Sequence, residues 1–243
     1  MSHNIFIAGA SGVIGRRLLP LLKAQGHRVL AITRSADKVA TLQAAGARAQ
    51  VLDVLQTEEL CHLLEAFQPQ IVIHQLTDLP AGLDPARMQE GIRRNAEIRR
   101  LGTASLIRAA QAGGAQRLIA QSIAWAYAPG PLPQDEQQAL ETTAPGARGI
   151  SVNGIADLER QVLGTPGIEG LVLRYGRLFG GDAGMEHAES PLGIHVDAAA
   201  HAALLAIHRG VPGCYNLAQA ELQVSTLKAR QVLGWQPDFR LEH

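Results

Sequence analysis

Seven residues near the start of the chain, Gly9-Ala10-Ser11-Gly12-Val13-Ile14-Gly15, predict much of its architecture. An apolar run at residues 4–8 precedes them, and apolar residues at helical spacing follow through residue 25. Glycines allow a tight turn between a strand and a helix, and the helix N-terminus offers free N–H groups to an anion. The pattern therefore predicts a strand–turn–helix unit that binds the pyrophosphate of a dinucleotide, with a purely structural turn as the alternative.

Beyond this turn, strand-like and helix-like patterns alternate along the chain. Apolar runs predict strands at residues 28–32, 48–52, 70–75, 117–121 and 170–174, and helical spacing predicts helices at 36–44, 56–67, 86–112 and 151–163. Such alternation is typical of a parallel sheet that is covered by helices on both faces. The expected fold class is therefore α/β, a Rossmann-like doubly wound parallel sheet.

The C-terminal part of the chain departs from this alternation. After a glycine-rich loop at 176–184, the pattern predicts a helix at 197–209, a strand at 214–217 and a helix near 224–233. These pieces are too small for an independent domain. We expect a dinucleotide-binding domain over residues 1–175 and a reduced substrate-side cap over 176–240, whose helices pack back on the core. Residues 241–243 are expected to be a tag remnant.

Composition argues against several classes of protein. In this 243-residue chain, 22 Lys and Arg residues balance 22 Asp and Glu residues, so no global charge attracts nucleic acid or a membrane surface. No apolar run of about 20 residues predicts a membrane span, and no signal-peptide pattern precedes the first strand. Two cysteines, Cys61 and Cys214, fit reduced thiols of a cytoplasmic protein. His195 and His201 lack metal-ligand spacing, so no metal is expected.

Several motifs together resemble one superfamily. They are the GxxGxxG turn, Leu52-Asp53-Val54, Gly102-Thr103, Gln121-Ser122, Leu173-Arg174-Tyr175-Gly176, His195-Val196-Asp197 and Val232-Leu233-Gly234-Trp235-Gln236-Pro237. Over nearly its whole length the chain resembles the extended short-chain dehydrogenase/reductase superfamily, specifically its NAD-dependent epimerase/dehydratase family. The resemblance implies an NAD(P)-binding protein, and an oxidoreductase or epimerase-like activity on a small carbonyl or alcohol substrate.

The resemblance also implies a cofactor site at the turn and at the ends of the strands. Its expected residues are Gly9, Ser11, Gly12, Val13, Ile14, Gly15, Arg34, Ser35, Asp53, Val54, Leu76, Thr77 and Tyr175. In the family, Asp53 would accept a hydrogen bond from the adenine amino group, and Val54 would pack on the ring.

The end of the second strand bears on the choice of cofactor. NAD-specific relatives carry an acid there, which accepts hydrogen bonds from the ribose hydroxyls. This chain has no acid in Ala31-Ile32-Thr33-Arg34-Ser35. Arg34 can bind a 2′-phosphate bidentately and Ser35 can add a hydroxyl, so we expect NADP, with NAD as the alternative.

The catalytic pattern of the family is incomplete in this chain. The family places a tyrosine and a lysine four residues apart on the helix before the sixth strand, and the lysine lowers the pKa of the phenol. With Glu159 as the anchor of the alignment, these positions fall on Ser151 and Ile155. An asparagine usual in the long helix falls on Arg99. The serine after the fifth strand is matched by Ser122.

No shift of the alignment restores the lysine, because none lies between Lys38 and Lys228. Tyr127, five residues after Ser122, is the expected replacement acid, with a packing role as the alternative; Tyr175 is a second candidate. Two functions therefore stay open. One is an NADP-dependent oxidoreductase in which Ser122 and Tyr127 polarise the substrate oxygen. The other is a non-catalytic sensor or regulatory protein that binds NADP(H).

Related enzymes dimerise by packing the long helix and the following helix into a four-helix bundle. The matching surfaces are residues 88–112 and 151–163, with Ile107, Leu158 and Val162 as candidate apolar contacts. The resulting expectation is a cytoplasmic homodimer that acts on a small molecule, with no nucleic-acid or membrane partner.

Overall fold

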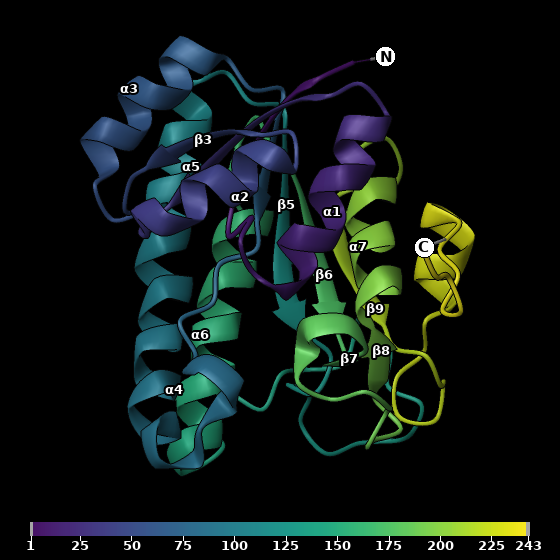
Figure 1. The fold of residues 1–243 in the computed structure, drawn as a ribbon. Helices are drawn as coiled ribbons and strands as arrows, with labels where there is room; N and C mark the ends of the chain where they lie inside the picture. Colours follow the sequence, from purple (N-terminus) through teal and green to yellow (C-terminus); the bar gives the residue numbers. More distant parts are fainter. Residues whose placement is uncertain (1, 242–243) are drawn as a thin grey trace.

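Seven parallel strands form one sheet in the computed structural model, which describes residues 2–241 (Figure 1). The strands are β1 (Asn4–Ala8), β2 (Arg28–Thr33), β3 (Arg48–Val51), β4 (Ile71–His74), β5 (Arg117–Ile123), β6 (Glu169–Tyr175) and β9 (Gly213–Leu217). Their order is β3-β2-β1-β4-β5-β6-β9, so the order reverses between β1 and β4. In such sheets the crevice at this reversal, beyond the carboxyl ends of the strands, is where ligands bind.

Helices cover both faces of the sheet, which confirms the expected fold class (Figure 1). One face carries α1 (Val13–Ala24), α2 (Val39–Ala44) and α7 (Val196–Leu205), and the other carries α3 (Thr57–Phe67), α5 (Thr103–Ala112) and α6 (Gly146–Leu163). Side chains alternate across the sheet, so in β1 Ile5 and Ile7 enter one core while Phe6 and Ala8 enter the other. Burial on both faces explains why the strands are continuous apolar runs.

The long helix expected at 86–112 is interrupted. A short 3₁₀ turn, η3 (Pro85–Arg87), leads into α4 (Met88–Glu97), and a π-helical turn, η4 (Ile98–Gly102), separates α4 from α5. The hydroxyl of Thr103 donates a hydrogen bond to the carbonyl oxygen of Arg99 inside this turn. A threonine that bonds back to the residue four positions earlier distorts a helix locally, and periodicity alone does not predict such a distortion.

Several element ends also differ from the expected ones. Helix α6 begins at Gly146, five residues early, because Pro145 precedes it in extended conformation as its N-cap. Strand β5 continues to Ile123, which pairs with Tyr175 of β6. The expected helix at 224–233 is reduced to a π-helical turn, η6 (Ala229–Leu233), which two α-helical residues, 227 and 228, precede. Val224 instead makes an isolated parallel bridge to Gln134.

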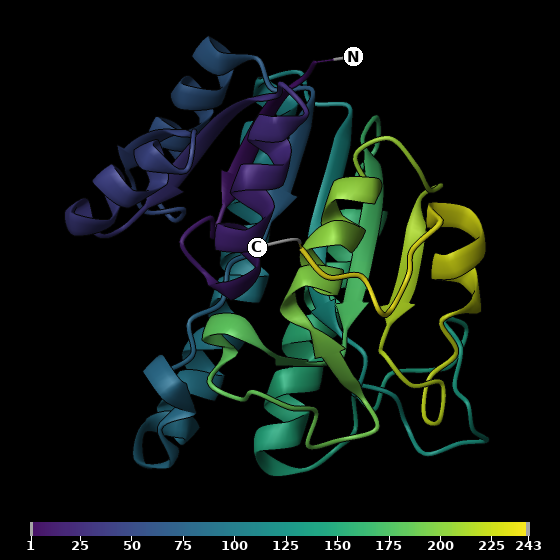
Figure 2. The same cartoon turned by 45° about the vertical axis from the view of Figure 1, so that its right-hand side comes forward.

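The C-terminal residues extend the main sheet and its core. β9 pairs with β6 as the edge strand, α7 packs against α1, and β7 (Arg177–Phe179) and β8 (Gly193–His195) form a separate parallel pair (Figure 2). Trp235 is buried and its indole N–H donates to the carbonyl oxygen of Ala198 at 2.9 Å. The expected boundary at residue 175 stays a prediction, and the expected tag remnant includes residues 242–243, which lie outside the described residues.

The loops that follow β5 and β6 gather with β7 and β8 below the arrowheads of the strands (Figures 1 and 2). The carboxyl edge of the sheet is therefore the edge at which a site can form. Across residues 2–241, none of the helices combines the length and apolar character needed to cross a membrane.

Candidate functional site

The turn after β1 admits only glycine at two positions. Gly9 has φ +90°, and a Cβ there would lie 2.3 Å from the carbonyl oxygen of Gln75. A Cβ at Gly15 would lie 2.5 Å from the carbonyl oxygen of Ala10. Gly12 is the N-cap of α1 and supplies no side-chain cap. The first N–H groups of the helix therefore remain open to an anion, as a pyrophosphate requires.

A groove of ≈ 230 Å³ lies beside this turn at the carboxyl edge of β1, β2 and β4. Its lining includes the expected residues Gly9, Ser11, Gly12, Arg34, Ser35, Asp53, Val54, Leu76 and Thr77. Four expected residues do not line it. Val13, Ile14 and Gly15 form the first turn of α1, and Tyr175 lies in the core, 2% exposed. The cofactor roles of these residues stay predictions.

The groove also contains residues that sequence analysis missed: Ile32, Thr33, Lys38, Leu52, Gln75 and Ile98. Three of them, Thr33, Leu52 and Gln75, directly precede an expected residue at a strand end, so the strand-end rule identifies them once the strand ends are known. Lys38 lies one helical turn after Arg34, at the end of η1 (Ala36–Lys38). Ile98 comes from the π-helical turn, and only the tertiary fold brings it to the groove.

The cationic rim of the groove is already paired. The guanidinium of Arg34 lies 3.0 Å from one carboxylate oxygen of Asp78, and Arg94 lies 3.5 Å from the other. The backbone N–H of Asp78 donates to the side-chain oxygen of Asn95 at 2.9 Å. The Arg34 side chain is 58% exposed, so its ion pair with Asp78 contributes little stability. A phosphate can therefore replace Asp78 as its partner.

Gln75 lines the groove, but its side-chain amide is enclosed and lies beside the buried hydroxyl of Tyr175. This amide therefore links the groove to the core and is not exposed to a ligand. The open helix N-terminus and the glycine turn together fit a bound dinucleotide.

At the other end of the carboxyl edge, Ser122 and Glu159 belong to a buried polar network. Ser122 is 0% exposed and its hydroxyl donates to a carboxylate oxygen of Glu159 at 2.6 Å. Arg174 donates to the two oxygens of the same carboxylate, at 2.9 and 2.6 Å. Burial disfavours the charged guanidinium, but hydrogen bonds and charge from Glu159 outweigh it and raise the pKa of Arg174. The guanidinium of Arg174 therefore remains charged inside the protein.

Tyr127 belongs to the same network. Its hydroxyl donates to the side-chain oxygen of Asn216 at 2.6 Å and accepts from Arg174 at 2.7 Å. Burial raises the pKa of Tyr127 to about 12, although the charge of Arg174 opposes the shift. The backbone N–H of Asn216 in turn donates to Glu136 at 2.7 Å, which attaches the loop after β5 to β9. The catalytic roles of Ser122 and Tyr127 stay predictions, and both hydroxyl protons are bound within the network.

The positions of the family's tyrosine and lysine are buried and differ from it in chemistry. Ser151 is 9% exposed and Ile155 is 0% exposed. Ile155 belongs to a small apolar cluster with Ile123, Ala126 and Val152, against which Trp125 and Leu140 pack. The position of the family's lysine is therefore apolar in this protein.

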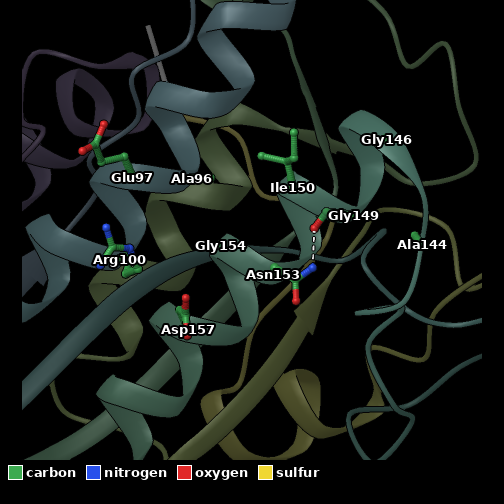
Figure 3. A pocket seen from close by; sticks show the side chains of 10 residues that line it. All are labelled: Ala96, Glu97, Arg100, Ala144, Gly146, Gly149, Ile150, Asn153, Gly154 and Asp157. Atoms are coloured by element: carbon green, nitrogen blue, oxygen red, sulfur yellow. Dashed lines mark hydrogen bonds between the residues drawn. The ribbon is translucent and has the colours of Figure 1, made fainter.

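A second groove, of ≈ 530 Å³, lies between α4 and α6 and away from the glycine turn (Figure 3). Its lining consists of Ala96, Glu97, Arg100, Ala144, Gly146, Gly149, Ile150, Asn153, Gly154 and Asp157. A Cβ at Gly154 would lie 2.8 Å from the Cα of Ala96, so this glycine allows the two helices to approach closely.

This helix pair is the surface expected to form a dimer, which stays a prediction. The expected contacts need correction, because Leu158 and Val162 are 0% exposed and pack in the core beneath α6. Helical spacing identified an apolar face, but that face is turned toward the sheet. Ile150, which is 37% exposed, is the apolar side chain that α6 presents outward in this groove.

Known proteins share this fold and its sequence pattern. The profile of a family described as NAD(P)H-binding matches residues 9–178. A 3-diazoavenalumate denitrifying reductase from a Streptomyces species is 37% identical over 239 residues, which cover 90% of this chain and 76% of that protein.

Solved structures agree on the fold at lower identity. UDP-glucose 4-epimerase from Thermotoga maritima, solved with UDP-glucose, aligns with a TM-score of 0.79 at 17% identity, over 98% of this chain and 94% of that chain. The Bordetella bronchiseptica enzyme WbmG, in complex with NAD, aligns with a TM-score of 0.74 at 18% identity, over 99% and 91%. The chain therefore belongs to the NAD(P)H-binding family and has the fold of the extended short-chain dehydrogenases/reductases that its motifs resemble.

Proposed function

We propose that the protein is an NADPH-dependent reductase that removes the diazo group from a small aryl diazonium carboxylate. Its relative at 37% identity is named as a denitrifying reductase of a diazo acid. The observation that carries the proposal is the missing proton donor at the reaction end of the site. Ile155 stands in an apolar cluster, and the hydroxyl protons of Ser122 and Tyr127 are bound to Glu159 and Asn216.

The chemistry of a diazonium group suits such a site. Reduction of a carbonyl needs a hydride and a proton, and therefore an acid within reach. Reduction of an aryl diazonium needs the hydride alone: a C–H bond forms, the C–N bond breaks, and its electron pair leaves with dinitrogen. A bound NADPH would supply that hydride. Alkyl diazonium ions lose dinitrogen spontaneously in water, so an aryl substrate is the one that requires an enzyme.

The loops around the reaction end support an aromatic anion as the substrate. Residues 124–145, 176–192 and 218–226, which follow β5, β6 and β9, contain no lysine and a single arginine, Arg177. The guanidinium carbon of Arg177 lies 5.6 Å from the centre of the Trp125 ring. Within residues 2–241, Arg177 is in no ion pair with a carboxylate. In the proposed complex Arg177 supplies positive charge on the loop side of the substrate, which favours an anion, and the Trp125 ring contacts the aryl ring.

The preference for NADPH rests on the rim of the dinucleotide groove. Arg34, Ser35 and Lys38 line it at the end of β2. Two cations and a hydroxyl at this position suit a 2′-phosphate, whereas the ribose hydroxyls of NAD are usually bound by an acid.

The test uses 4-carboxybenzenediazonium, which becomes benzoate when it is reduced. The protein with NADPH should produce benzoate and oxidise NADPH in equal amounts, faster than an enzyme-free mixture, and should use NADH less well. Arg34→Glu serves as the cofactor-site control and should lose the NADPH-dependent rate.

Two other outcomes would replace the proposal. Reduction of aldehydes or ketones without turnover of the diazonium would indicate the carbonyl reductase that the family pattern suggests. If the protein bound NADPH tightly but reduced neither the diazonium nor aldehydes and ketones, it would be a sensor or regulatory protein.

A further inference from the structure

Arg99 is a buried cation that has no partner among the residues that the structure describes. The residue is 5% exposed. Within residues 2–241 its guanidinium makes no hydrogen bond, and no carboxylate lies within the 4.0 Å of an ion pair. None of the side-chain nitrogens of Arg99 is both fully enclosed and without a hydrogen-bond partner. Because they have no partner, the small exposed part of Arg99 must include its guanidinium. The charged group therefore opens onto a space that water or a ligand can reach.

Its position is between the dinucleotide groove and the altered catalytic helix. Arg99 lies in the π-helical turn η4, directly after Ile98, which lines the dinucleotide groove. The same turn packs on α6. Glu159 of α6 is close enough to influence the charge of Arg99, and Glu159 shares a helix face with Ile155 four residues earlier. Arg99 is thus a cation near the position where the family's lysine is replaced.

The backbone at Arg99 is held by a chain of buried hydrogen bonds. The hydroxyl of Thr103 donates to the carbonyl oxygen of Arg99, so it must accept from the Nε2–H of His74, 2.9 Å away. The Nδ1 atom of His74 then accepts from the backbone N–H of Leu76 at 3.3 Å. Burial, together with the charge of Arg99, lowers the pKa of His74 to about 3, so this histidine is neutral. The π-helical turn is therefore attached to β4 and to the groove-lining segment after it.

The guanidinium stays charged despite its burial. Burial lowers the pKa of Arg99 to about 10, and Glu159 opposes the shift. Glu159 cannot serve as its direct partner, because Arg174 and Ser122 already bind that carboxylate. A charge held in place without a partner costs stability, and proteins retain such groups mainly at sites where a ligand completes the pairing.

We propose that Arg99 forms an anion-binding site beside the dinucleotide groove, where η4 packs on α6, and that it replaces the cation lost from α6. The ligand chemistry is an anionic oxygen, carried by the pyrophosphate of the dinucleotide or by the substrate carboxylate. The planar guanidinium binds two such oxygens at once. A π-helical turn at this point agrees with the proposal, since these turns are frequent at functional sites.

Two substitutions and one control test the proposal. Arg99→Met removes the charge at similar volume, Arg99→Lys retains a cation, and Arg108→Met alters an exposed arginine of α5 that pairs with Glu58. Calorimetric titration gives the Kd of NADPH. In saturating NADP⁺ it also gives the Kd of trans-cinnamate, with uncharged cinnamamide as the control that lacks the carboxylate. Thermal unfolding without ligand gives Tm.

The expected result separates a ligand site from a structural arginine. Arg99→Met should weaken binding of NADPH or of cinnamate at least tenfold, Arg99→Lys should retain part of the affinity, and Arg108→Met should change neither. Because Arg99→Met removes an unpaired buried charge, its Tm without ligand should rise by about 2 °C or more. A loss confined to NADPH assigns the pyrophosphate, and a loss confined to cinnamate assigns the substrate. Two results would overturn the proposal. One is that Arg99→Met binds both ligands with unchanged affinity. The other is that Arg99→Met and Arg99→Lys lose affinity equally and both have a lower Tm. Each outcome is independent of whether a diazonium is turned over.

Discussion

The two ends of the carboxyl edge follow different rules. At the end beside the glycine turn, where we propose that the adenosine half of the cofactor binds (the adenosine end), the turn, Asp53 and the groove agree with the family pattern, and the tight turn is made by backbone. At the end beside β5 and β6, where we propose that the reaction occurs (the reaction end), the family's tyrosine and lysine are replaced, and the polar side chains of Ser122, Tyr127 and Arg174 bind within their own network. The difference teaches that cofactor binding depends on a fold-level geometry, whereas the reaction depends on a few side chains that can change without altering the fold.

The largest expected effect falls on the reaction end. Glu159→Gln leaves the buried guanidinium of Arg174 without its charged partner, and breaking such a pair costs about 3–5 kcal/mol in the free energy of unfolding. Urea denaturation measures the loss. The control is Asp157→Asn on the same helix, whose exposed pair with Arg160 contributes about 1 kcal/mol or less. Similar losses for both variants would contradict the central place of Glu159 in the network.

The adenosine end should break most readily at the glycine turn. Gly9→Ala places a Cβ against the carbonyl oxygen of Gln75, 2.3 Å away, at a φ of +90°. We expect about 1–3 kcal/mol of strain and an NADPH affinity at least tenfold weaker, measured by fluorescence titration. Gly26→Ala is the matched control, because Gly26 has φ +74° with no atom within 4 Å of the added Cβ. Equal effects of the two variants would mean that backbone conformation, rather than the close approach, is what Gly9 provides.

The ion pair on the groove rim sharpens the cofactor assignment. Arg34→Glu should weaken NADPH at least tenfold, about 1.4 kcal/mol, while NADH binding changes little. Asp78→Asn should do the reverse and tighten NADPH, because it releases Arg34 from a carboxylate 3.0 Å away. Parallel titrations with NADPH and NADH check both variants. If Arg34→Glu lost equal affinity for NADPH and for NADH, Arg34 would not be the residue that binds the 2′-phosphate.

Tyr127→Phe distinguishes a structural phenol from a catalytic one. The variant loses hydrogen bonds to Asn216 and Arg174, so we expect about 1 kcal/mol lower stability. Diazonium turnover should persist, since that reaction needs no acid and the pKa of Tyr127 is raised to about 12. Rates measured with 4-carboxybenzenediazonium decide the matter. Loss of all turnover in a stable variant would assign the catalytic role to Tyr127.

The smallest expected effect lies at the opposite edge of the sheet. The rings of His3, His27 and His208 lie 5.1 to 5.7 Å apart, near Arg117 of β5. Burial and the neighbouring histidines lower the pKa of His27 and of His208 in the folded protein. The unfolded chain therefore binds more protons, so this stabilisation is present above the ordinary histidine pKa and is lost as the pH falls through the lowered values. His208→Gln should reduce the fall in Tm between pH 7 and pH 5. An unchanged dependence of Tm on pH would show that the histidine cluster does not cause this fall.

Local pattern was sufficient for the sheet, the glycine turn and most of the groove. Strand ends meet at one edge in any parallel sheet, so residues such as Asp53 and Leu76 were placed together by their position after a strand. The missing lysine was equally certain, because the composition between Lys38 and Lys228 contains none. These features depend on spacing and residue identity within short segments, which a sequence displays directly.

Other features were decided by tertiary structure alone. Ser122 and Glu159 are 37 residues apart, and Tyr127 and Asn216 are 89 apart, so their bonds exist only after β5, α6 and β9 pack together. The inward direction of Leu158 depends on which face of α6 meets the sheet. Arg99 matched a family asparagine in sequence, but its burial with no partner among residues 2–241 follows from a π-helical turn and from the pairing of Glu159 with other groups. Long-range packing selects among the partners that residue types allow, and spacing along the chain carries no record of that selection.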